Sequence, residues 1–105
     1  MAINRVVIDG IVVKDSQLCH LTEDNKIFLK FKILHTHKAF DELENAYFNC
    51  VMFGKRAFTF VEHIVKGAFV TLDGVLKEDS GQLYLQIIKL NYQAYKKEDD
   101  VRRCK

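Results

Sequence analysis

The clearest pattern in the chain is the alternation of residues 27–35, which read Ile-Phe-Leu-Lys-Phe-Lys-Ile-Leu-His. Side chains of a β-strand point in turn to opposite faces, so this stretch predicts a strand with two different faces. One face carries Ile27, Leu29, Phe31 and Ile33, and the other carries Phe28, Lys30, Lys32 and Leu34. The first face predicts a core strand, whereas a ring beside two cations is costly to bury and suits an exposed surface.

Four more stretches predict strands. Residues 4–13 are rich in Val and Ile, and Gly10 within them indicates a bulge or a sharp bend. Residues 47–53 alternate, and they place Tyr47 and Phe53 on one side, together with Asn49 and Val51. Residues 69–76 and 83–92 predict a last pair of strands, joined through a tight turn at residues 78–81 that contains Gly81.

Between the strands, residues 56–65 have apolar side chains at helical spacing, followed by Gly67 as a stop signal, and predict a short helix. Residues 14–25 and 36–46 are polar and irregular and predict loops, the second of them a long hairpin loop. The predicted order is therefore three strands, a helix and two strands. This is the order of the oligonucleotide-binding (OB) fold, an all-β, five-stranded Greek-key barrel with one helix between strands three and four.

Length and composition limit the alternatives. A chain of 105 residues makes one domain, here residues 1–93, and residues 94–105 predict a short charged, flexible tail. The net charge of +2 does not by itself indicate a nucleic-acid binder, which needs a local basic patch. Three widely spaced cysteines do not suggest a disulfide framework, and Cys50 is expected to be buried. These cysteines fit a reducing compartment, and we expect a cytoplasmic protein. No apolar run reaches the length of about 20 residues that a membrane helix needs.

The predicted open face has the chemistry that unpaired nucleotide bases need. Exposed rings offer flat surfaces on which bases stack, and nearby cations attract phosphates. Phe28, Lys30 and Lys32 are candidates from the alternation of residues 27–35. Tyr47 and Phe53 are candidates from residues 47–53, although each of these rings could instead belong to the barrel core.

Three segments together resemble the bacterial single-stranded DNA-binding protein family. They are the opening run Ile3-Asn-Arg-Val-Val-Ile8, Phe31 with Ile33, and Phe48-Asn-Cys-Val-Met-Phe-Gly-Lys55. Val65-Lys-Gly67 followed by the strand that ends near Gly74 matches a further element of the family. The resemblance covers roughly residues 2 to 92.

The resemblance implies an OB barrel that binds single-stranded DNA without strong sequence preference, in replication, recombination or repair. It implies that subunits associate, as a homotetramer or a dimer, that no cofactor is needed, and that the protein is not an enzyme. By position, Tyr47 and Phe53 match the stacking pair of the third strand, and Phe40 matches a loop aromatic after a one-residue shift. The phosphate contacts that the resemblance suggests are Arg5, Lys14, Lys55 and Lys77.

The chain departs from the family pattern in two places. Residues 77–82 form a short hairpin instead of a long basic and aromatic loop, which predicts a smaller footprint or a different wrapping of DNA. Residues 101–105 read Val-Arg-Arg-Cys-Lys, without the acidic tip that recruits partner enzymes in the family. We therefore do not expect recruitment through such a tip, and we expect a nucleoid-associated location in the cytoplasm.

Other functions are left open or disfavoured. An OB barrel that serves as a protein-interaction module with weak DNA affinity is the main alternative, and an RNA-binding barrel is another. The histidines and Cys19 have spacing too loose for a zinc site, so no metal is expected. Asp41, Glu42 and Glu44 lack an apolar surround that would tune them for acid-base catalysis, and they read as a solvated charge run.

Overall fold

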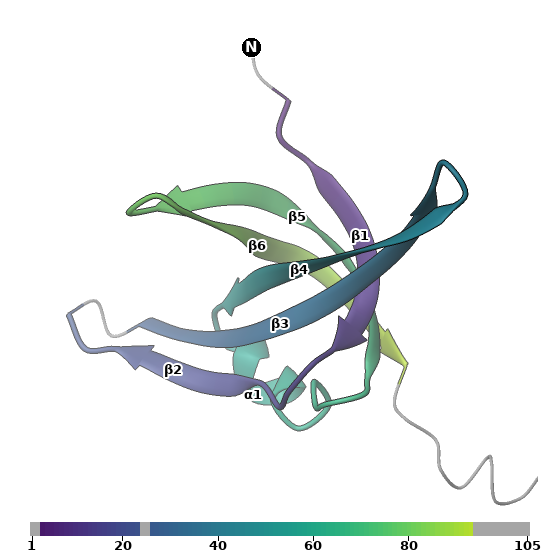
Figure 1. Ribbon diagram of the computed structural model, residues 1–105. Helices are drawn as coiled ribbons and strands as arrows, with labels where there is room; N and C mark the ends of the chain where they lie inside the picture. Colours follow the sequence, from purple (N-terminus) through teal and green to yellow (C-terminus); the bar gives the residue numbers. More distant parts are fainter. Residues whose placement is uncertain (1–2, 24–25, 94–105) are drawn as a thin grey trace, which may run out of the picture.

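Six strands and one short helix make up the part of the chain that the computed structural model describes, residues 3–23 and 26–93 (Figure 1). The predicted tail at residues 94–105 lies outside these residues. The elements in chain order are β1 Val6–Val12, β2 Gln17–Leu21, β3 Lys26–Ala39, β4 Glu42–Phe53, α1 Arg56–Phe60, β5 Phe69–Asp79 and β6 Gln82–Gln93.

Five of the strands close into a barrel. The sheet order is β1-β5-β6-β4-β3-β2, and a further pairing of β1 with β3 joins the ends of the ring. Neighbours are antiparallel except β4 and β6, which pair in parallel at Cys50↔Leu85 and Val51↔Gln86. The all-β, five-stranded barrel with a helix after the third barrel strand, β4, is therefore confirmed.

The two predicted loops are wrong in part. Residues 14–25 contain β2, which pairs with the first part of β3 from Gln17↔Lys30 to Leu21↔Lys26. The segment at 36–46 is no long loop, because β3 and β4 stay paired as far as Ala39↔Glu42. Only Phe40 and Asp41 turn the chain, both with positive φ. Side chains on both faces of this two-stranded ribbon are largely exposed, so its sequence carries no apolar alternation.

Two smaller predictions also need correction. The helix ends at Phe60 instead of Val65, and a further turn brings Ile64 into the core. No bulge occurs at Gly10, since β1 pairs with β5 in continuous register. A Cβ at Gly10 would lie 2.7 Å from the carbonyl oxygen of Leu34, so glycine is needed there for the close approach of β3. The ladder irregularity lies between Asp73 and Gly74 on β5.

The core fills the barrel and is closed at one end by α1 and the turn that follows it. Its buried members come from every barrel strand, and they are Val12, Leu29, Phe31, Ile33, Cys50, Met52, Ala57, Ile64, Ala68, Val70, Leu72, Leu85, Ile87 and Leu90. Burial raises the pKa of the Cys50 thiol to about 12, so Cys50 is an inert core residue, as predicted. Within the described residues, no helix has the length and apolar character needed to cross a membrane.

Candidate nucleic-acid interface

The outward faces of β3 and β4 lie side by side and form the centre of the candidate interface. Their register pairs Phe28 with Phe53, Lys30 with Val51, Lys32 with Asn49, and Leu34 with Tyr47. The alternate residues on both strands, such as Leu29, Phe31, Cys50 and Met52, are buried in the barrel. The predicted division of these strands into a core face and an open face is therefore confirmed.

Aromatic rings are spaced along this open face. Tyr47 exposes 63% of its surface, and Phe53 is half-buried. The rings of Phe28 and Phe53 meet across the strand pair with centroids 5.5 Å apart and an angle of 47° between their planes. Such a tilted pair holds both rings in place while leaving ring surface open to solvent.

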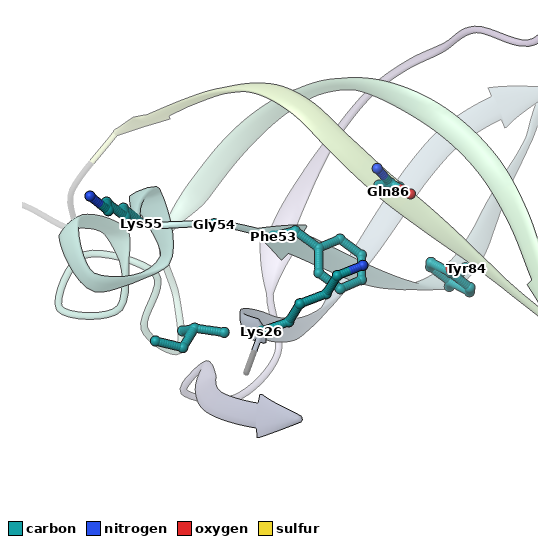
Figure 2. Close-up of a pocket in the computed structure, with 7 residues that line it drawn as sticks. Lys26, Phe53, Gly54, Lys55, Tyr84 and Gln86 are labelled. Carbon is teal, nitrogen blue, oxygen red and sulfur yellow. The ribbon is translucent and has the colours of Figure 1, made fainter. Parts of the chain in front are cut away.

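Two lysines lie over these rings. Lys32 places its Nζ atom 5.9 Å from the centroid of Tyr47, and Lys26 places its Nζ atom 5.9 Å from that of Phe53. Figure 2 shows the long side chain of Lys26 reaching across the Phe53 ring. The attraction between a cation and a ring is weak at an exposed site. When a base stacks on the ring, the ammonium group on its long side chain can therefore move to a phosphate.

Three adjoining hollows run along this face. The first, of about 180 Å³, is lined by Lys14, Asp15, Gln17, Lys30, Phe31, Lys32 and Asn49. The second, of about 610 Å³, shares Lys30 and Asn49 with the first and adds β2 and the β5–β6 hairpin as walls. The third, of about 650 Å³, shares Phe53 and Tyr84 with the second and ends at Lys26, Gly54 and Lys55. We call this run of hollows the groove.

The structure brings most of the candidate residues into the groove. Lys14, Phe28, Lys30, Lys32, Phe53 and Lys55 line it. Tyr47 lies next to it on β4, two residues from Asn49. Lys77 is exposed on β5, where it pairs with Tyr84, a residue shared by the second and third hollows.

Two candidates lie elsewhere. Arg5 contacts Asp73 on the β1–β5 side of the barrel, with its guanidinium donating to both carboxylate oxygens at 3.3 and 2.9 Å. This ion pair lowers the pKa of Asp73 and raises that of Arg5. Phe40 is 98% exposed at the tip of the β3–β4 ribbon, which projects from the barrel (Figure 1), and it lines none of the three hollows.

Sequence reasoning missed several groove residues. Tyr84 and Gln86 come from β6, where the burial of Leu85 and Ile87 directs the alternate residues outward. That alternation is visible in the sequence, but the parallel contact of β6 with β4 is not. Lys26 lies one residue before the start of the strand that the sequence predicts, and the alternation of β4 marks Asn49 only as a neighbour of Tyr47.

A metal site finds no support among the described residues. His35 and His37 stack at 5.4 Å, but they face different carboxylates, Asp9 at 3.4 Å and Glu44 at 3.3 Å. No group of three or more histidine, cysteine or acidic side chains in residues 3–23 and 26–93 has the geometry to hold a metal ion.

Known proteins resemble this chain in sequence. The model of the Single-strand binding protein family matches residues 3–83. A single-stranded DNA-binding protein of Borreliella burgdorferi is 37% identical over an alignment of 84 residues, and the match covers 76% of this chain. The chain spans only 56% of the length of that relative.

Solved structures resemble the fold at lower identity. The protein PriB from Ralstonia solanacearum superposes with a TM-score of 0.74 at 17% identity, over 88% of this chain and 99% of that one. The SSB domain of a Synechococcus protein gives a TM-score of 0.73 at 18% identity, over 87% of this chain and 97% of that one. At such identities the likeness shows a shared fold.

Proposed function

The chain belongs to the single-strand binding protein family, and from this premise we propose that it coats single-stranded DNA through the groove on β3 and β4. The observation that carries the proposal is the continuity of the groove. Half-buried rings and lysines line it from Lys14 at one end to Lys55 at the other.

Binding in this proposal rests on two kinds of contact. Bases stack on Tyr47, Phe28 and Phe53, each stacked base contributing about 1–3 kcal/mol with little dependence on its identity. Phosphates lie against Lys14, Lys26, Lys30, Lys32 and Lys55, and displace counterions as they do so. We leave Arg5 out of this interface because Asp73 holds it on the β1–β5 side. Phe40 and Lys77 would reach a strand that extends beyond the groove.

The biological setting we propose is the handling of exposed single strands in DNA replication, recombination or repair, by a homo-oligomer in the cytoplasm. Support for self-association comes from β1, whose outward residues Val7 and Ile11 are 62% and 47% exposed. Phe69, paired with Ile11 on β5, is exposed beside them. Apolar side chains grouped on one side of a small barrel favour contact with another subunit.

The test is a titration of fluorescein-labelled dT oligomers of several lengths by fluorescence anisotropy, at low and high salt, with duplex DNA as the control. We expect tight binding to dT, little binding to duplex, and a steep loss of affinity with salt. The shortest oligomer that binds with full affinity gives the footprint. Absence of binding at low salt would contradict the proposal and favour the protein-interaction alternative.

A further inference from the structure

The two walls of the groove differ in charge. Its lysines come from β3, from the connection between β1 and β2, and from the residue before α1. The opposite wall is formed by β6 and the β5–β6 hairpin, and its lining residues carry no cation. They are Asp79, Ser80, Gln82, Leu83, Tyr84 and Gln86.

Asp79 is the acidic residue of this wall, and the hairpin fixes its place. It pairs with Gln82 across a two-residue turn of Ser80 and Gly81, whose φ angles are 54° and 82°. Both Asp79 and Gln82 line the same hollow as Phe28 and Phe53. A base stacked on this ring pair would therefore occupy the same hollow as the carboxylate.

The carboxylate of Asp79 has capacity for another donor. The Ser80 hydroxyl donates to Oδ1 of Asp79 over a long 3.4 Å. Among the described residues no lysine, arginine or histidine lies within ion-pair distance of Asp79. A carboxylate accepts several hydrogen bonds and donates none, so it repels a phosphate and attracts an N–H group.

We propose that the groove orients the strand across its width, with phosphates along the lysine wall and base edges toward Asp79, which accepts a hydrogen bond from an exocyclic amino group. This inference rests on the proposed function and adds a modest base preference to it. Cytosine offers its N4 amino group to a carboxylate. Uracil presents an N3–H flanked by two carbonyl oxygens, which the carboxylate repels.

The test compares fluorescein-labelled dC and dU oligomers of equal length, because these bases share ring size and neither carries a methyl group. We expect the wild-type protein to bind dC about two- to tenfold more tightly than dU, the effect of one net hydrogen bond. In Asp79→Asn the ratio of the two affinities should fall toward one, because an amide can serve either base. Circular dichroism melting of each variant checks that the barrel is intact.

Glu78→Gln is the matched control. It removes one negative charge from the residue next to Asp79, and the Glu78 side chain does not line the groove. It should raise both affinities alike and keep the dC/dU ratio of the wild type. An equal affinity of the wild type for dC and dU, or an unchanged ratio in Asp79→Asn, would overturn the role of Asp79 while leaving DNA binding in place. Failure of the wild type to bind either oligomer at low salt would overturn the proposed function as well.

Discussion

Side chains on the two faces of β4 have different surroundings although they lie close together in the sequence. Met52 and Cys50 face the barrel and are fully buried, whereas Tyr47 on the other face is 63% exposed. Phe48, on the inner face, packs against the core. Truncation of an exposed ring removes little buried area, so its cost in folding stability is small compared with that of a core residue.

We predict that Tyr47→Ala weakens dT binding by about 1–3 kcal/mol, the contribution of one stacked base, and leaves the melting temperature nearly unchanged. Phe53→Ala should weaken binding to a similar degree and cost somewhat more stability, because Phe53 packs against Phe28. Fluorescence anisotropy and thermal melting measure the two effects.

Met52→Ala provides the contrast, since truncation of this buried side chain should lower the folding stability by about 2–5 kcal/mol. A loss of stability in Tyr47→Ala as large as in Met52→Ala would place the Tyr47 ring in the core. It would remove Tyr47 from the proposed interface.

At the scale of elements, the β3–β4 pair serves two purposes along its length. Its first part lies in the barrel wall and forms the floor of the groove, while its far part is a ribbon that ends in the turn at Phe40 and Asp41. Both turn residues have positive φ, at 52° and 69°. A bulky residue is disfavoured in this conformation, which glycine and asparagine adopt more easily.

Phe40→Asn should therefore raise the free energy of unfolding by up to about 1 kcal/mol, because asparagine tolerates the left-handed conformation. If Phe40 also stacks a base, the same variant binds long dT oligomers more weakly and short ones as tightly as the wild type. Urea unfolding and anisotropy test the two parts separately. If Phe40→Asn and the wild type bind oligomers of every length with the same affinity, Phe40 is excluded from the DNA path.

The lysines of β3 give a second prediction at this scale. The double variant Lys30→Ala, Lys32→Ala should make the slope of log affinity against log salt concentration shallower by about 1.4. Each phosphate contact on a single strand contributes about 0.7 to the magnitude of this slope. The measurement is a salt titration with a dT oligomer. Lys66→Ala is the control, since this exposed lysine lines none of the hollows. An unchanged slope in the double variant would move the phosphate path off β3.

At the scale of the whole molecule, the groove and the apolar β1–β5 side occupy different parts of the barrel. The groove lies over β2, β3, β4 and the first part of β6, whereas Val7 and Ile11 lie on β1 beside β5. In the proposed assembly, separation of the two surfaces would let subunits associate without covering the groove. A single strand could then pass from one subunit to the next.

Val7→Glu with Ile11→Glu should reduce the mass measured by light scattering to that of a monomer, because two charges would be buried in the subunit contact. Binding of a short dT oligomer should persist in the monomer, since no groove residue changes. Leu43→Glu on the ribbon, a residue 74% exposed, is the control and should keep the assembly. A wild-type protein that is already monomeric would contradict the proposed self-association.

The local pattern of the sequence determined the strands of the barrel wall and the inner and outer faces of β3 and β4. Period-two alternation is a property of the chain itself, so Leu29, Phe31, Cys50 and Met52 could be assigned to the core from sequence. The same reasoning found the rings and lysines on the floor of the groove. It failed where side chains are exposed on both faces, as in β2 and the β3–β4 ribbon, because strands there depend on backbone pairing more than on burial.

Tertiary structure alone decided which distant residues share the groove. The parallel pairing of β6 with β4 brings Tyr84 beside Phe53, and the short β5–β6 hairpin places Asp79 opposite the lysines. The same closure of the barrel put Arg5 beside Asp73, 68 residues away, on a side of the barrel that the groove does not reach. Contacts between distant segments depend on strand order and register, which are set when the barrel closes and which no local periodicity encodes.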